Sequence, residues 1–272
     1  MNRAQLIQSV GKAPVIGSAL RRYASRYKDG SVVTIKSGVA RGLRWRRYHR
    51  YVNGYWTGQY EYPMQQALSR LLGPGKTFWD VGANAGFFSL VARKLVGESG
   101  RVVSFDPDPE NAASVREQIS INDFGSNWSC ESVAVGDAEG ELEFRRSAPG
   151  SPKGHLTSTG VEGFNVGEAT GDEVMRVPVV TYDSVLGRLP GPDVIKMEIE
   201  GAELLAMAGA SRLLADVRPT WLIELHGPAC ERVVRTTLSD AGYSFRTVEG
   251  EAVPSSSDSL PRHFVAVTTG AG

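Results

Sequence analysis

From Thr77 onward, the chain alternates short apolar runs with amphipathic segments. The runs are TFWDV (77–81), RVVSF (101–105), ESVAV (131–135), DVIKMEI (193–199) and TWLIEL (220–225). Helical periodicity marks 85–96, 109–120, 202–215 and 231–242. Such alternation is typical of a parallel sheet covered by helices on both faces. We therefore expect an α/β, Rossmann-like fold with a mostly parallel, doubly wound sheet. The last runs, SFRTV and HFVAV, are expected to be antiparallel at one edge.

The residues before this alternation predict a separate, basic extension. We expect short helices over 4–28, a hairpin over 32–48, and a helix starting at Pro63, so that 1–62 precedes a domain over 63–272. Residues 1–50 hold twelve basic residues and one acid, Asp29, whereas the whole chain has zero net charge. The extension is therefore either a surface for an anionic partner or a solvated face balanced by acids elsewhere. The zero net charge argues against a nucleic-acid-binding polycation.

Cysteine content and hydropathy indicate the compartment. Cys130 and Cys230 form no disulfide framework and match no metal-ligand spacing. No apolar run approaches the roughly 18–20 residues of a membrane span. We expect a cytoplasmic protein.

One long segment interrupts the alternation. ELEFRR (141–146) and MRVPVVTY (175–182) predict a strand pair, and the polar, Gly-rich stretch between them far exceeds the usual loop of about 4–6 residues. We expect 147–174 to be a mobile cover over a binding site.

The turn after the first apolar run, DVGANAG (80–86), predicts a ligand site. In an open parallel sheet, ligands bind outside the carboxyl ends of the strands. A dinucleotide site would have G-x-G-x-x-G, but Asn84 replaces the middle glycine and Asp80 would repel a pyrophosphate. Asp106, at the end of the second run, is placed to accept ribose hydroxyls. A ligand with a ribose, a charged amino-acid tail and no phosphate is S-adenosylmethionine.

Several motifs in order resemble those of the FkbM-type S-adenosylmethionine-dependent methyltransferases. They are DVGANAG (80–86), VVSFDPDPEN (102–111), VAVGDAEGELEF (133–144), VPVVTYDSVL (177–186), IKMEIEGAE (195–203) and LIELH (222–226), with YWTGQYEYPMQQAL upstream. The family pattern more often reads FEP and KxDVEG, and here the acids are exchanged to FDP and KMEIEG. The resemblance implies a class I methyltransferase fold.

The resemblance also implies a set of cofactor contacts. Asp80, Gly82, Asn84 and Gly86 would cradle the methionine part, and Asp106 would hold the ribose. Asp137 would reach the adenine amino group, although a plain turn residue is nearly as good an interpretation. Glu61 is a further candidate contact.

Four polar residues at the ends of the later strands are candidate catalytic groups: Glu198, Glu200, Glu224 and His226. A hydroxyl acceptor needs a base or a metal to remove its proton. Either His226 is that base, or the acids and His226 bind a divalent cation, for which Mg, Ca or Mn suits carboxylate ligands. Glu200 could instead cap the following helix, which is the favoured interpretation of Glu203. His155 is either a substrate contact or exposed, and exposure is the favoured expectation. His49 and His263 have no evident partner.

These features predict an O-methyltransferase that acts on a hydroxyl of a sugar or small secondary metabolite. A non-catalytic nucleoside-binding module and a nicotinamide-dependent oxidoreductase are the alternatives. The acidic cluster argues against the first, and the missing middle glycine argues against the second. The acceptor, the metal dependence and the oligomeric state stay open.

Overall fold

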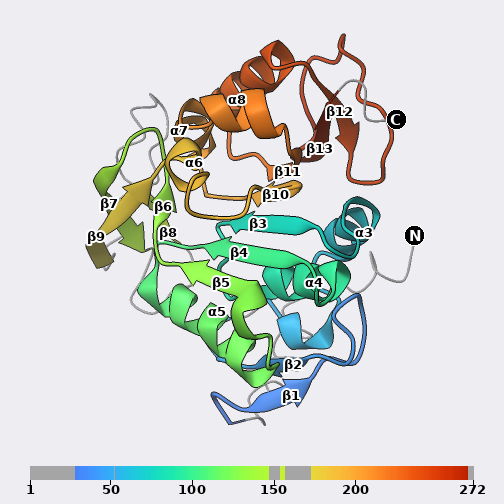
Figure 1. Cartoon of the computed structure of the whole chain (residues 1–272), viewed down its shortest axis with the longest axis vertical. Helices are drawn as coiled ribbons and strands as arrows, with labels where there is room; N and C mark the ends of the chain where they lie inside the picture. Colours follow the sequence, from blue (N-terminus) through green and yellow to red (C-terminus); the bar gives the residue numbers. More distant parts are fainter. Residues whose placement is uncertain (1–27, 52, 147–153, 157–172, 269–272) are drawn as a thin grey trace, which may run out of the picture.

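The computed structural model describes residues 28–51, 53–146, 154–156 and 173–268, and its centre is a seven-stranded sheet (Figure 1). From one edge to the other, the strands are β12 (Tyr243–Thr247), β13 (His263–Thr268), β11 (Thr220–Glu224), β10 (Val194–Met197), β3 (Thr77–Val81), β4 (Arg101–Phe105) and β5 (Trp128–Glu131). β13 is antiparallel to both of its neighbours, and the ladders from β11 to β5 are parallel. Counted along the chain, the order is sixth, seventh, fifth, fourth, first, second, third, which confirms the expected class I fold.

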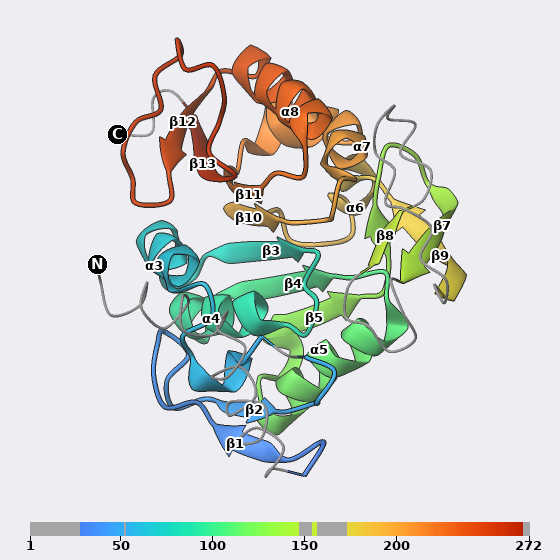
Figure 2. The same ribbon diagram turned by 180° about the vertical axis from the view of Figure 1, so that it is seen from behind.

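Helices cover both faces of this sheet (Figures 1 and 2). On one face lie α3 (Tyr62–Leu71), α4 (Phe87–Val96) and α5 (Pro109–Ile121); on the other lie α6 (Tyr182–Val185), α7 (Glu203–Ala208) and α8 (Pro228–Asp240). Successive strand residues point to opposite faces, so Phe78 belongs to the first apolar cluster and Trp79 to the second. Strands buried on both sides explain the near-continuous apolar runs.

A second, four-stranded sheet lies beyond the carboxyl ends of the central strands (Figure 2). Its order is β6 (Ala134–Val135), β9 (Glu173–Val180), β7 (Gly140–Arg146) and β8 (Gly154–Leu156). The antiparallel pairing of β7 with β9 confirms the predicted strand pair. A single strand over 131–135 was wrong, however, because Glu131 already pairs with Phe105, the last residue of β4, and a longer strand would lack a neighbour there. Most of the predicted cover, 147–153 and 157–172, lies outside the described residues.

The helix predicted over 202–215 is interrupted. α7 ends at Ala208, and a π-helical turn, η3 (Leu213–Val217), follows. Gly209 lies close to the loop that follows β6: a Cβ on Gly209 would be 2.3 Å from the Gly136 carbonyl oxygen. The Asp183 carboxylate accepts the backbone amides of Arg212 and Leu213, so a new turn starts at that point.

The N-terminal residues that the structure describes pack onto the α4 and α5 face. β1 (Val32–Thr34) and β2 (Arg44–Arg46) form the predicted hairpin, and η1 (Tyr55–Thr57) is a single 3-10 turn. A similar turn, η2 (Gly125–Asn127), lies between α5 and β5. Trp45 and Tyr55 are buried in the same apolar cluster as Phe87. The helices expected over 4–28 lie outside the described residues, and the division of the chain at residue 62 stays a prediction.

Several arginines of the basic extension have acidic partners. Arg44 contacts Asp123 at 2.7 Å, and Arg46 contacts Glu117, on α5, at 3.4 Å. In this part of the chain, the balancing acids are thus within the protein itself. Among the helices that the structure describes, none combines the length and the apolar character required to cross a bilayer.

Candidate active site

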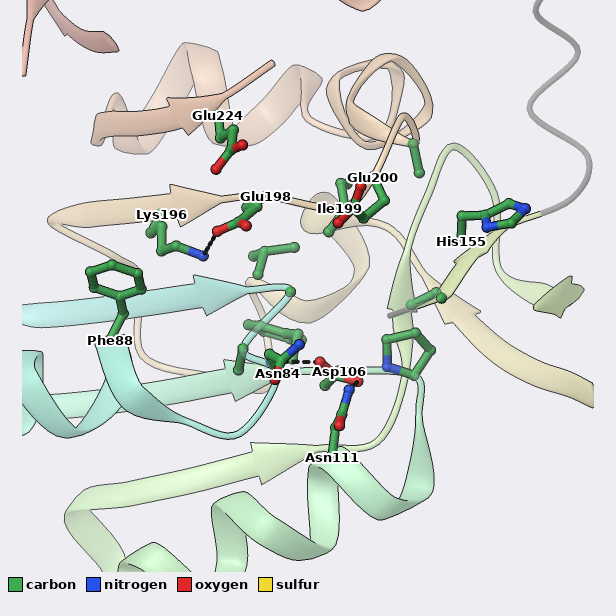
Figure 3. Close-up of a pocket in the computed structure, with 18 of the residues that line it drawn as sticks. Asn84, Phe88, Asp106, Asn111, His155, Lys196, Glu198, Ile199, Glu200 and Glu224 are labelled. Atoms are coloured by element: carbon green, nitrogen blue, oxygen red, sulfur yellow. Dashed lines mark hydrogen bonds and ion pairs between the residues drawn. The ribbon is translucent and has the colours of Figure 1, made fainter. Parts of the chain in front are cut away.

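A cavity of about 600 Å³ opens at the carboxyl ends of the central strands. Its floor consists of residues that follow β3, β4, β5 and β10 and of Glu224, the last residue of β11. The strand order reverses between β3 and β10. This is the position at which open α/β sheets bind ligands. Figure 3 shows its two ends: Asn84, Asp106 and Asn111 lie at one, and Glu198 and Glu224 at the other.

Asp106 organises the first end. Its Oδ2 atom accepts the Asn84 backbone amide at 2.7 Å; its Oδ1 atom accepts the Asp108 amide at 3.0 Å and the Asn111 side-chain amide at 3.2 Å. Burial raises the pKa of Asp106 to about 7, although the Asn84, Asp108 and Asn111 hydrogen bonds oppose this shift. Three of the roughly four lone-pair positions of this carboxylate are thus occupied, and Oδ2 can still accept one hydrogen bond from a ribose. Asp106 thus lines the cavity, and its contact with a ribose stays a prediction.

The glycine turn brings β3 and β10 close together. A Cβ at Gly82 would lie 1.9 Å from the Glu198 carbonyl oxygen, and φ at Gly82 is +80°, so only glycine fits. Asn84 also has a positive φ, 51°, a conformation that asparagine tolerates better than most residues. This explains an asparagine where a dinucleotide site would have glycine.

Three of the expected cofactor residues do not line the cavity. Asp80 is fully buried within β3, where it accepts the Ser89 hydroxyl and lies 3.7 Å from the Lys196 ammonium. Gly86 packs against Val115 at the start of α4. Asp137 is exposed after β6, which belongs to the smaller sheet. Contacts from these residues to the cofactor stay predictions.

The second end of the cavity contains paired carboxylates. Glu198 follows β10 and contacts the buried Lys196 ammonium at 2.8 Å. Glu200 lines the cavity, is 42% exposed, and lies 3.4 Å from Nε2 of His226. Lys196 also lies 5.1 Å from the centre of the Phe88 ring. One buried cation thus lies between Asp80, which is buried within β3, and Glu198, a carboxylate that lines the cavity.

Several basic side chains surround the Glu224 carboxylate. Arg262 contacts it at 2.5 Å and His263 at 2.8 Å, because β13 inserts beside β11 and places His263 opposite Glu224. Burial alone would raise the pKa of Glu224, but the His263 hydrogen bond and the charges of His263 and Arg262 lower it to about 2. The sequence showed no partner for His263, since the neighbour of β11 depends on the order of the strands.

His226 does not line the cavity. Its Nδ1 atom lies 2.8 Å from Glu203, and its Nε2 atom lies 3.4 Å from Glu200 and 3.7 Å from Glu224. Burial favours the neutral ring, but the Glu203 hydrogen bond and the three carboxylates outweigh it and raise the pKa of His226. Glu203 is fully buried and also accepts the Ile199 amide at 3.3 Å. When it is protonated, His226 is thus a cation that holds these carboxylates in place. Catalysis by His226 stays a prediction.

The candidate metal ligands are not those expected. Among the described residues, the donor atoms that lie within 4.8 Å of one another belong to Glu61, Glu224 and His263, not to His226. Glu224 is already neutralised by Arg262 and His263, and a guanidinium 2.5 Å from this carboxylate would repel a second cation. The donor set therefore does not fit a divalent ion.

The smaller sheet forms one wall of the cavity. His155 and Leu156 of β8 and Phe144 of β7 line it, and Figure 3 shows His155 opposite the central strands. The expectation of an exposed His155 was wrong, because its exposed fraction is 9%. Pairing of β8 with β7 buries this residue, and no local pattern within a Gly-rich stretch indicates such pairing.

The sequence model of one known domain, the methyltransferase FkbM domain, matches residues 80–245. The chain belongs to this family. The description of this family is that of a methyltransferase domain.

Individual relatives are distant. The hexuronic acid methyltransferase AglP of Haloferax volcanii is 25% identical over 169 residues, which are 61% of this chain and 62% of that protein. The match thus spans less than two thirds of the relative's length. A solved methyltransferase FkbM from Methylobacillus flagellatus has a TM-score of 0.45 at 16% identity, covering 94% of this chain and 60% of that one. Aeropyrum pernix fibrillarin with natively bound S-adenosyl-L-methionine has a TM-score of 0.41 at 11% identity, covering 72% and 67%.

Proposed function

We propose that this FkbM-family protein methylates a hydroxyl group of a sugar or another small polyhydroxylated metabolite. One observation carries the proposal: a single cavity joins the Asn84–Asp106 turn to the carboxylates at the ends of β10 and β11. The first end suits a nucleoside with an amino-acid tail, and the second suits a neutral acceptor rich in hydrogen-bond donors.

The first end fits S-adenosylmethionine. Asp106 would hold the ribose hydroxyls, the turn at Gly82 and Asn84 would face the amino-acid part, and Pro107 and Val133 supply apolar walls for a flat ring. A volume of about 600 Å³ lies within the range of cofactor sites, roughly 300–1,000 Å³. When bound, the cofactor supplies an electrophilic methyl group on a sulfonium centre.

The second end would position the acceptor. Glu198 and Glu224 accept hydrogen bonds from hydroxyl groups, and their cationic partners hold both side chains in fixed orientations. His226 would contribute indirectly, because it holds Glu200 and Glu224. Holding a nucleophile close to and in line with the reacting carbon can itself supply about 7–11 kcal/mol of the barrier. The name of the Haloferax relative, a hexuronic acid methyltransferase, supports a sugar acceptor.

The proposal is tested with S-adenosylmethionine that carries a ¹³C-labelled methyl group. Glucuronic and galacturonic acids are offered beside the matched neutral sugars glucose and galactose, both free and as glycosides. Hydroxyl transfer is expected to give an alkali-stable methyl ether, whereas transfer to a uronic acid carboxylate would give an alkali-labile ester. Methyl groups found only in esters, or only in RNA or protein added to the same assay, would contradict the proposal.

A further inference from the structure

Four carboxylates surround the acceptor end of the cavity: Glu61, Glu198, Glu200 and Glu224. Three of them have a basic partner, since Lys196 pairs with Glu198, His226 with Glu200, and Arg262 and His263 with Glu224. Within the described residues, Glu61 has no basic side chain at ion-pair distance. The site therefore contains three neutralised carboxylates and one that is not.

The environment of Glu61 leaves one oxygen available to a ligand. Its Oε2 atom is buried and has no hydrogen-bond partner among the described residues. Glu61 occupies the N-cap of α3, where acids usually accept a helix amide, but its side chain makes no capping hydrogen bond. A buried oxygen without a partner is costly, and such groups persist where function requires them.

The backbone at Glu61 is also strained. Its φ is 39° and its ψ is 54°, a left-handed conformation that costs a residue with a Cβ about 1–2 kcal/mol. Among the described residues, five other than glycine have a positive φ, and three of these, Glu61, Asn84 and Glu200, line this cavity. Strain of this kind concentrates at functional sites. The left-handed turn places a carboxylate in the cavity instead of on the helix end.

We propose that Glu61 is the catalytic base that removes the proton of the acceptor hydroxyl, an inference that rests on the proposed function. The acceptor O–H bond breaks and its proton moves to Oε2 of Glu61. The acceptor oxygen forms a bond to the methyl carbon, the carbon–sulfur bond breaks, and its electron pair stays on sulfur. Glu61 then returns the proton to solvent, so the protein ends as it began.

The charges around Glu61 favour this role over the other carboxylates. Burial raises the pKa of Glu61, and the charge of the Glu198 carboxylate raises it further. A hydrogen bond with Tyr60 and the charge of Lys196 lower it, but the net shift of the pKa is upward. The pKa of Glu224, beside His263 and Arg262, is about 2, which makes it a weak base. Two carboxylates whose environments push their pKa values apart take different roles. Here Glu61 accepts the proton and Glu224 orients the acceptor.

The test compares Glu61→Gln with the wild-type enzyme, using a sugar that the acceptor panel identifies. Removing a base is expected to lower kcat by about 10²–10⁴-fold, with the Kd for S-adenosylhomocysteine within about twofold. Glu61→Asp should restore part of the rate, and Glu139→Gln, at an exposed carboxylate outside the cavity, should match the wild type. The acid limb of the wild-type pH profile should be missing in Glu61→Gln.

Two kinetic results would overturn the assignment. Turnover within tenfold of wild type would exclude a base at Glu61, and a weaker Kd with kcat retained at saturation would make it a cofactor contact, the role first expected. A further test that needs no acceptor measures the pKa of Glu61 directly, by ¹³C NMR of carboxyl-labelled protein bound to S-adenosylhomocysteine. The signal that is missing in Glu61→Gln is the signal of Glu61. If wild type methylates none of the sugars, the proposed function fails; the inference then falls as well if Glu61 titrates at or below the ordinary glutamate pKa of about 4.3.

Discussion

The two ends of the cavity differ in how the chain assembles them. The polar contacts of the cofactor end come from one continuous stretch, from the turn after β3 to the first turn of α5, and Asp106 is its centre. The acceptor end combines Glu61 before α3 with Glu198, Glu224 and Arg262, which follow or flank three different strands. A ligand common to a family can be bound by a short continuous motif. An acceptor particular to one member is bound by residues that only the folded sheet brings together.

The largest effect is expected at Lys196, which contacts both the buried Asp80 and Glu198 of the acceptor end. Lys196→Met leaves the fully buried Asp80 without its nearest cation, and breaking a buried pair in this way costs about 3–5 kcal/mol in the free energy of unfolding. Urea denaturation measures the loss. Glu198→Gln, which keeps the contact between Lys196 and Asp80, should lose less, and equal losses would show that Asp80 does not depend on Lys196.

A substitution of Asp106 tests the cofactor end alone, through the affinity for S-adenosylhomocysteine. Asp106→Ala removes a charge-assisted ribose contact and should weaken S-adenosylhomocysteine binding by about 2–3 kcal/mol, measured by calorimetry. Asp137→Ala removes an exposed carboxylate outside the cavity lining and should bind as wild type does. Wild-type affinity in the Asp106 variant would exclude the ribose site, and a large loss at Asp137 would support its predicted adenine contact.

His226 tests whether the acceptor end depends on a supporting cation. His226→Asn leaves the buried Glu203 without its 2.8 Å partner and should cost about 2 kcal/mol of stability at pH 6. Because the pKa of His226 is raised, this stabilisation is complete below about pH 6.5 and is lost as pH rises through the folded-state value. Denaturation of both proteins should therefore converge towards high pH. If the variant instead turned over at least about 10²-fold more slowly, as expected for a missing base, His226 would be the base.

A pH titration sharpens the description of the cofactor end. A ribose hydroxyl would donate to the ionised form of Asp106, and burial raises the pKa of Asp106 to about 7. Affinity for S-adenosylhomocysteine should thus fall about tenfold between pH 8 and pH 6. Calorimetry across this range should give a flat profile for Asp106→Asn, and an equal pH dependence in that variant would assign the effect to another group.

The smallest effect is expected from a chelator. Since Arg262 and His263 already neutralise Glu224, transfer rates should be unchanged after EDTA treatment and after addition of Mg²⁺. Loss of activity in EDTA that returns with Mg²⁺ or Mn²⁺ would restore the metal-dependent alternative for the acceptor end.

Local patterns determined much of the fold and the cofactor end. Buried runs became β3 and β4 with the predicted bounds, and Asp108 caps α5 by accepting the Glu110 amide at 2.8 Å. Asn84 and Asp106, both candidates from the sequence, are joined by a hydrogen bond. Predictions were wrong at 131–135 and 202–215, where contacts with distant segments end the element.

The sequence by itself determined which residues end the strands, and so it supplied Asp106, Glu198 and Glu224 as candidates. Only the tertiary structure decided which of them have cationic partners. His263 neutralises Glu224 because β13 inserts antiparallel beside β11, and His155 reaches the cavity because β8 pairs with β7. Side-chain periodicity is a local property of the backbone, whereas the partner of a charge depends on strand order and register. These arise from packing the whole sheet, which no single segment encodes.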